Sequence, residues 1–81
     1  MNIRLKLFSV ARDITGFDEK TVIVDPQADA AAVLRQLVAE HPALESWKGS
    51  LRLAVNCEYV SATHRLREGD EVAIIPPVSG G

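Results

Sequence analysis

A reactive C-terminal carboxyl group is the chemistry that best suits the end of this 81-residue chain. The last six residues are Pro76-Pro77-Val78-Ser79-Gly80-Gly81. Two successive prolines cannot continue a β-ladder and favour polyproline II, so six residues would extend roughly 19 Å from the preceding element. Gly80 and Gly81 have no side chain, and they can therefore pass through a narrow channel in any backbone conformation. The sequence predicts that the carboxylate of Gly81 is presented at the tip of an extended tail.

A free carboxylate is a poor electrophile, because nucleophilic attack adds negative charge to a group that is already negative. Joining it to AMP at the expense of ATP supplies a good leaving group, and a sulfur nucleophile can then form a thiocarboxylate. Glycine obstructs that attack least. Glycine-containing termini without a function are also common, so the tail alone leaves an ordinary chain end as the alternative.

Composition restricts the function classes open to this chain. Hydrophobic residues make up 47% and charged residues 25%, as in an ordinary soluble globular domain. The net charge of −2 argues against a nucleic-acid-binding protein, which needs a basic excess. No apolar run approaches the ~18 residues of a membrane span, and no secretory signal is evident. The single cysteine, Cys57, cannot form an internal disulfide or a four-ligand zinc site, and we expect a cytoplasmic protein.

Alternating and helical patterns predict the elements that position the tail. Residues 2–8 alternate as a half-buried strand, and further strands are expected at 20–25, 51–56, 59–60 and 71–75. Asp29 is expected to cap the main helix, which runs to about Glu40 with apolar residues on one face. This order predicts an α+β fold with a mixed sheet of about five strands and one main helix on one face. The expected division is a domain over residues 1–75 and a flexible tail over residues 76–81.

Shorter elements are expected between these. Ser9 is predicted to cap a short helix over residues 10–15, and Gly16 to end it in the left-handed conformation. Residues 43–50 are predicted to form a loop. Tight turns are expected at Asn56-Cys57-Glu58 and at Glu68-Gly69-Asp70.

One face of the predicted sheet is a candidate docking surface. If the first and last strands pair, Phe8 and Ile75 lie close together on the side away from the helix, with Arg4, Lys6 and Arg52 around them. An exposed aromatic and aliphatic pair ringed by positive charge suits a protein partner. The alternative is a solvated sheet face that carries one stray phenylalanine.

Other reactive side chains carry weaker signals. Cys57 could relay sulfur, but a turn residue without a chemical role explains it more simply. His41 and His64 are too distant in the sequence for a metal site to be expected. Asp70 and Glu71 could bind a cation, yet turn formation accounts for Asp70 better. No bound metal or cofactor is expected.

The chain resembles the β-grasp sulfur carriers related to ubiquitin, and most closely the small subunits of molybdopterin synthase. The resemblance covers the whole chain. Its specific part is the C-terminal block, in which Ile-Pro-Pro-Val precedes the two glycines. The segments that carry it are Leu5-Lys6-Leu7-Phe8-Ser9-Val10-Ala11-Arg12-Asp13, Ala54-Val55-Asn56 and Gly69-Asp70-Glu71-Val72-Ala73-Ile74-Ile75-Pro76-Pro77-Val78-Ser79-Gly80-Gly81.

The resemblance implies a chemical role for the terminus and three protein partners. An activating enzyme related to the ubiquitin E1 would consume ATP to adenylate Gly81, and a sulfur donor would convert it to a thiocarboxylate. The tail, Pro76 to Gly80, would bind in the large synthase subunit, where sulfur passes to cyclic pyranopterin monophosphate. The implied assembly is a heterotetramer whose catalytic side chains lie on the large subunit, so this chain would be a protein cosubstrate. A thiamine-type sulfur carrier, a ubiquitin-like protein modifier and a simple binding module remain as alternatives.

Overall fold

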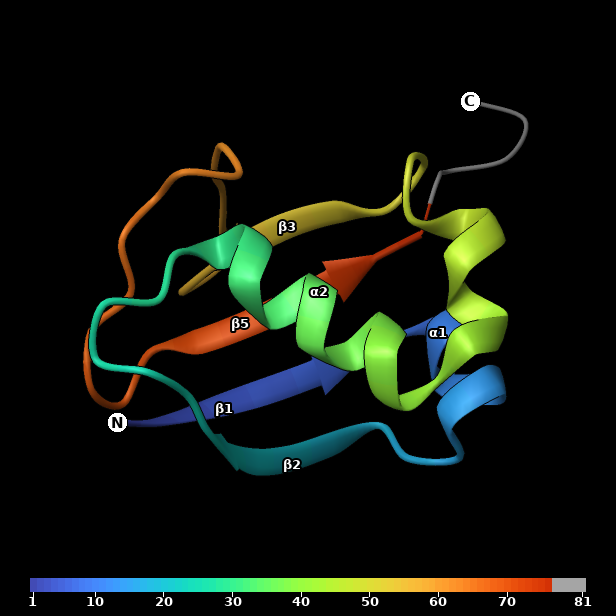
Figure 1. Ribbon diagram of the computed structural model, residues 1–81, viewed down its shortest axis with the longest axis horizontal. Coiled ribbons are helices and arrows are strands. Elements are labelled where there is room, and N and C mark those ends of the chain that lie inside the picture. Colours follow the sequence, from blue (N-terminus) through green and yellow to red (C-terminus); the bar gives the residue numbers. More distant parts are fainter. Residues whose placement is uncertain (77–81) are drawn as a thin grey trace.

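The computed structural model describes residues 1–76, in which one mixed β-sheet is covered on one face by a long helix, with two shorter helices at one end of the sheet (Figure 1). The predicted α+β class and the single main helix are confirmed. The elements are β1 (Asn2–Leu7), α1 (Ser9–Thr15), β2 (Glu19–Ile23), α2 (Ala30–Glu40), the 3-10 helix η1 (Pro42–Trp47), β3 (Arg52–Val55), β4 (Glu58–Tyr59) and β5 (Glu71–Ile75).

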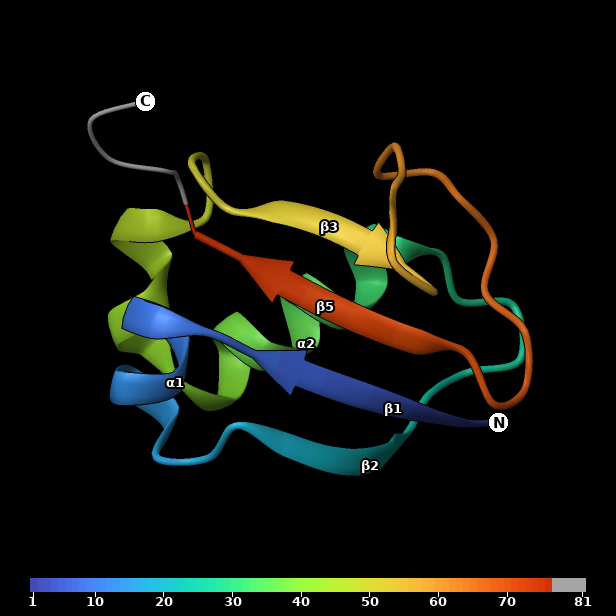
Figure 2. The same ribbon diagram turned by 180° about the vertical axis from the view of Figure 1, so that it is seen from behind.

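The five strands lie in the order β2-β1-β5-β3-β4, so the last strand in the sequence is the central strand of the sheet. β5 is parallel to β1, with Leu5 opposite Val72 and Leu7 opposite Ile74. The other three pairings are antiparallel. Figure 2 shows β5 between β1 and β3, seen from the side away from α2. Because β5 has a neighbouring strand on both edges, it is a rigid support for the C-terminal end of the chain.

The core lies between the sheet and the helices. The alternation in β1 is confirmed, since Ile3, Leu5 and Leu7 are buried whereas Arg4 is exposed. In α2 the buried positions follow helical spacing, and the partly buried Leu34 and Val38 pack beside them. The largest fully buried side chains each contribute about 1.5–3 kcal/mol of transfer free energy. They are Ile3, Leu7, Leu44, Val72 and Ile74.

Two predicted helix boundaries are confirmed by their hydrogen bonds. The Asp29 side chain accepts from the backbone N–H of Ala32 at 2.9 Å, which satisfies one of the unpaired donors at the start of α2. Gly16 ends α1 at φ 85°, and its N–H donates to the carbonyl of Arg12 at 2.8 Å. A side chain at Gly16 would be strained in this left-handed conformation.

Two local predictions were wrong. Ser9 is the first residue of α1, not its cap, because its φ of 51° is not the extended conformation that a capping residue needs. Phe8 occupies the capping position, and no side chain caps this helix. The expected loop over residues 43–50 contains η1, in which Pro42 supplies a helical φ and Leu44 is buried.

Among residues 1–76, the helices are too short to cross a membrane.

Candidate functional site

The tail is anchored at the end of the central strand. Ile75, the last residue of β5, lies opposite Arg52 of β3. Pro76 comes directly after it and is partly buried, and without an N–H it cannot extend the ladder. The predicted roles of Pro77, Val78, Ser79, Gly80 and Gly81 fall outside the described residues and stay predictions. The structure therefore shows that the segment after Pro76 starts at the end of β5.

A depression of about 270 Å³ lies beside this point, on the sheet face that is turned away from α2. Phe8 and Ile75 both line it, so the predicted proximity of these two side chains is confirmed. Phe8 is 44% exposed, and Ile75 is half-buried. Their role in binding a partner stays a prediction. The full lining is Lys6, Phe8, Ala54, Cys57, Tyr59, Glu71, Ala73 and Ile75.

Small side chains at the centre of the sheet make the floor of this depression. Ala73 of β5 lies opposite Lys6 of β1 on one side and Ala54 of β3 on the other. Ala54 is in turn opposite Tyr59 of β4. Because neither alanine rises far above the sheet, the larger side chains of Phe8 and Tyr59 stand around a hollow.

Tyr59 was not recognised in the sequence as part of this surface. The hairpin between β3 and β4 has only Asn56 and Cys57 between the paired residues Val55 and Glu58. Both turn residues have positive φ, 50° and 73°, as a two-residue type I′ hairpin requires. This register turns Tyr59 to the outer face, where its side chain is largely exposed. The Asn-Cys pair was the signal that could have placed it.

The expected ring of positive charge is partly neutralised. Lys6 lines the depression, but its Nζ lies 3.7 Å from Oε1 of Glu71. Arg4 pairs with Glu19 of β2, away from the depression. The guanidinium of Arg52 lies 4.5 Å from the centroid of the Tyr59 ring, in a cation–π contact. The surface is therefore an apolar hollow with charges of both signs at its rim.

The remaining candidates do not form a chemical centre. Cys57 is exposed and unpaired, and it lies at the edge of the depression. The ring of His41 lies 6.3 Å from the ring of Phe17 at the C-terminal end of α2, whereas the backbone of His64 is bonded to the N-terminal end of that helix. Within residues 1–76, no group of three or more His, Cys, Asp or Glu side chains is placed to hold a metal ion. Asp70 belongs to a turn, as expected, and accepts from the N–H of Arg67 at 2.8 Å.

Comparison with protein families gives a match over nearly the whole chain. The model of the ThiS family matches residues 5–81. The molybdopterin synthase sulfur carrier subunit of Chlamydomonas reinhardtii is 41% identical over 83 residues, covering 100% of both chains.

Solved structures share the fold. SAMP1 from Haloferax volcanii superposes with a TM-score of 0.84 at 34% identity, over 100% of each chain. A chain from a complex of subunits 1 and 2 of molybdopterin-converting factor from Helicobacter pylori superposes with a TM-score of 0.70 at 23% identity, again over 100% of each chain. These likenesses confirm the ubiquitin-like β-grasp architecture predicted from the sequence.

Proposed function

The chain belongs to the ThiS family and, within it, to the molybdopterin synthase sulfur carrier subunits, and from this premise we propose that it carries sulfur on Gly81 for molybdopterin synthesis. The full-length match to a curated carrier subunit supports this proposal. The observation that carries it in the structure is the position of Ile75. The chain leaves the central strand there, beside an apolar hollow that a partner can fill.

The proposed chemistry takes place in two steps. A carboxylate oxygen of Gly81 attacks the α-phosphorus of ATP, so pyrophosphate leaves and an acyl-adenylate forms. A donor then supplies sulfur at the oxidation level of sulfide, which attacks the acyl carbon and displaces AMP. The product is a thiocarboxylate, in which one carboxyl oxygen has been replaced by sulfur. This thiocarboxylate is the proposed sulfur source for cyclic pyranopterin monophosphate.

None of these steps needs a catalytic side chain from this protein. We propose that ATP is bound and consumed by an E1-like adenylating enzyme, that a separate protein donates sulfur, and that the large subunit of molybdopterin synthase carries the catalytic groups. The domain binds no cofactor of its own in this scheme and serves as a protein cosubstrate. The name of the Chlamydomonas relative, a subunit of the synthase, supports the large subunit as partner.

The proposed assembly with the large subunit is a heterotetramer that carries two copies of this chain, and its proposed location is the cytoplasm. A single cysteine, Cys57, which cannot form a disulfide within the chain, fits that compartment, where disulfides are rare. The depression around Phe8 and Ile75 is the proposed contact with the large subunit. It lies next to the start of the tail, so one partner can hold the domain and receive its terminus together.

Intact-mass spectrometry tests the proposal directly. The full chain is incubated with ATP, the activating enzyme and a sulfur source, and its mass is compared before and after. A carrier gains the mass difference between one sulfur and one oxygen, and the gain disappears without ATP. An unchanged mass with an enzyme that sulfurates another carrier under the same conditions would contradict the proposal.

A ubiquitin-like protein modifier is the second candidate, because a solved structure described as the small archaeal modifier protein 1 of Haloferax volcanii is 32% identical to this chain and covers 95% of it. Both functions begin with adenylation of Gly81, so they differ only in the product. A modifier forms isopeptide bonds with lysines and appears as conjugates of higher mass, whereas a carrier appears as the sulfurated monomer. The same mass measurement therefore separates them.

A further inference from the structure

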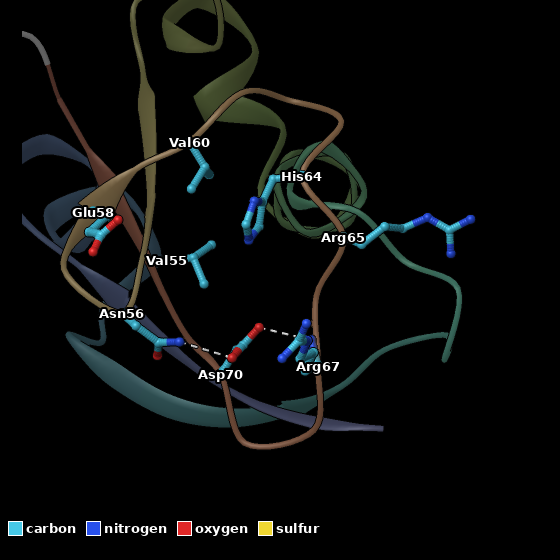
Figure 3. A pocket seen from close by; sticks show the side chains of 8 residues that line it. All are labelled: Val55, Asn56, Glu58, Val60, His64, Arg65, Arg67 and Asp70. Atoms are coloured by element: carbon cyan, nitrogen blue, oxygen red, sulfur yellow. Dashed lines mark hydrogen bonds between the residues drawn. The ribbon is translucent and has the colours of Figure 1, made fainter.

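A second and larger depression, of about 520 Å³, lies at the opposite end of β5 from the tail. It is bounded by the β3–β4 hairpin on one side and by the loop that leads from Val60 to Asp70 on the other (Figure 3). Val55 and Val60 form an apolar part of its lining, and His64 and Arg67 stand beside them. Nothing in the proposed sulfur transfer uses this surface.

The loop that carries His64 and Arg67 is fixed to the start of α2 by backbone hydrogen bonds. The carbonyl of His64 accepts from the N–H of Ala30 at 2.9 Å, and the N–H of Leu66 donates to the carbonyl of Ala28 at 3.2 Å. Leu66 is also buried in the core. The backbone at His64 and Arg67 is therefore held in place on both sides of Leu66.

Of the two acidic side chains that line the depression, Glu58 and Asp70, Asp70 is already engaged. Asp70 accepts from Nδ2 of Asn56 at 3.0 Å through one oxygen and from the N–H of Arg67 at 2.8 Å through the other. The side-chain oxygen of Asn56 accepts from the N–H of Glu71 at 3.0 Å, so this amide is occupied at both ends. Figure 3 shows these side chains along one edge of the depression.

The side chains of His64 and Arg67 still have N–H groups available to bind a ligand. Neither the imidazole of His64 nor the guanidinium of Arg67 makes a side-chain hydrogen bond or ion pair within residues 1–76. Arg65 differs, because its guanidinium donates to Oε1 of Gln27 at 2.8 Å and points away from the depression (Figure 3). Glu58 lies on the other side of the opening from Arg65 and Arg67 in the same view.

We propose that this depression binds a small phosphate monoester with an apolar body. Arg67 can donate two parallel N–H bonds to phosphate oxygens, and an imidazole donates at least one N–H in either protonation state. A carboxylate has only two oxygens, which one guanidinium fork satisfies, whereas a phosphate keeps a third oxygen for His64. The apolar body contacts Val55 and Val60.

The ligand site and the tail are separated by the length of the central strand. Four residue steps along β5 correspond to roughly 13 Å between Glu71 and Ile75. Figures 1 and 2 place the loop before β5 and the end of β5 on opposite sides of the domain. A ligand bound here leaves Ile75 and the hollow around Phe8 free, so the proposal stands independently of the sulfur-carrier function.

The test is a titration of the isotope-labelled full chain with phenyl phosphate, monitored by backbone amide shifts in NMR spectra. We expect saturable shifts confined to residues 55–60 and 61–70. His64→Ala and Arg67→Ala should each weaken binding about tenfold, the change that corresponds to losing one charge-assisted hydrogen bond. His41→Ala and Arg35→Ala, which remove the same groups elsewhere on the surface, should leave the affinity unchanged.

Two further ligands test the class of the compound. Benzoate lacks the third oxygen and inorganic phosphate lacks the apolar body, so both should bind more weakly than phenyl phosphate. Equal binding of benzoate would overturn the phosphate assignment, and equal binding of inorganic phosphate would overturn the apolar contact. Shifts that do not saturate, or that are equal in His64→Ala and the wild type, would overturn the site itself. Sulfuration of Gly81 is not part of this readout.

Discussion

Asn56 holds the backbone of Glu71 from both sides: its N–H donates to the Glu71 carbonyl at 2.9 Å, and its side-chain oxygen accepts from the Glu71 N–H at 3.0 Å. The amide nitrogen of the same side chain donates to Asp70 at 3.0 Å. One residue of the β3–β4 turn therefore fixes the start of the central strand. Its φ of 50° is also one that asparagine tolerates better than most residues.

Asn56→Ala should lower the free energy of unfolding by about 1–3 kcal/mol. The substitution removes both side-chain hydrogen bonds and places an alanine in the left-handed conformation. Urea denaturation measures the change. Asn2→Ala is the matched control. Within residues 1–76 the backbone of Asn2 bonds to Glu68 and Gly69, and its side chain makes no hydrogen bond that the substitution would remove. Equal stability of the two variants would contradict the assigned role of Asn56.

Cys57→Gly should raise the free energy of unfolding by about 0.5–1 kcal/mol. Cys57 has a φ of 73°, which costs a residue with a Cβ about 1–2 kcal/mol, and the greater flexibility of glycine in the unfolded chain offsets part of that gain. Thermal or urea unfolding of the reduced proteins measures the difference. Cys57→Ala keeps the backbone strain and should show no such gain, so a stabilisation shared by both variants would point to the thiol instead.

Phe8→Ala and Ile75→Ala should each weaken binding to the large subunit of molybdopterin synthase about tenfold while the domain stays folded. Each removes an apolar side chain from the hollow beside the tail, and truncation of a central contact costs upwards of 1 kcal/mol. Isothermal titration calorimetry measures the affinity. Ile23→Ala is the control, because Ile23 is 76% exposed and lies on β2, outside the hollow. Wild-type affinity in both variants would remove this surface from the interface.

Deletion of Gly81, or addition of one residue after it, should abolish sulfuration and leave the stability of the domain unchanged. In the proposed reaction the terminal carboxyl group is the one that reacts, and the strand ladders of residues 1–76 end at Ile75. Intact mass reports sulfuration, and circular dichroism reports folding. Full sulfuration of either variant would rule out the terminal glycine as the reacting residue.

Much of the fold could be predicted from the sequence because local and long-range signals agree. Asp29 precedes an apolar face with helical spacing, and the same face is buried against the sheet. The alternation in residues 2–7 could be assigned to a half-buried strand for the same reason. In both segments the residues that favour the local conformation also form the core.

The missed features depend on backbone conformations that the sequence specifies weakly. Ser9 is a good capping residue by type, yet the chain turns at its positive φ directly after β1, and Phe8 takes the capping position. Tyr59 could be placed on the outer face only once the hairpin was known to have a two-residue turn. The pairing of Arg4 with Glu19 likewise depends on the register between β1 and β2. These are relations between strands, which periodicity within one strand does not contain.

The parallel contact between β1 and β5 has a consequence for how this protein folds. These two strands come from opposite ends of the described chain, so nearly all of that chain must be brought into a closed loop before they meet. High contact order of this kind slows folding relative to a helical domain of equal size. We therefore expect the sheet to form cooperatively and late, so that Ile75, where the described strands end, is positioned only when β1 and β5 have paired.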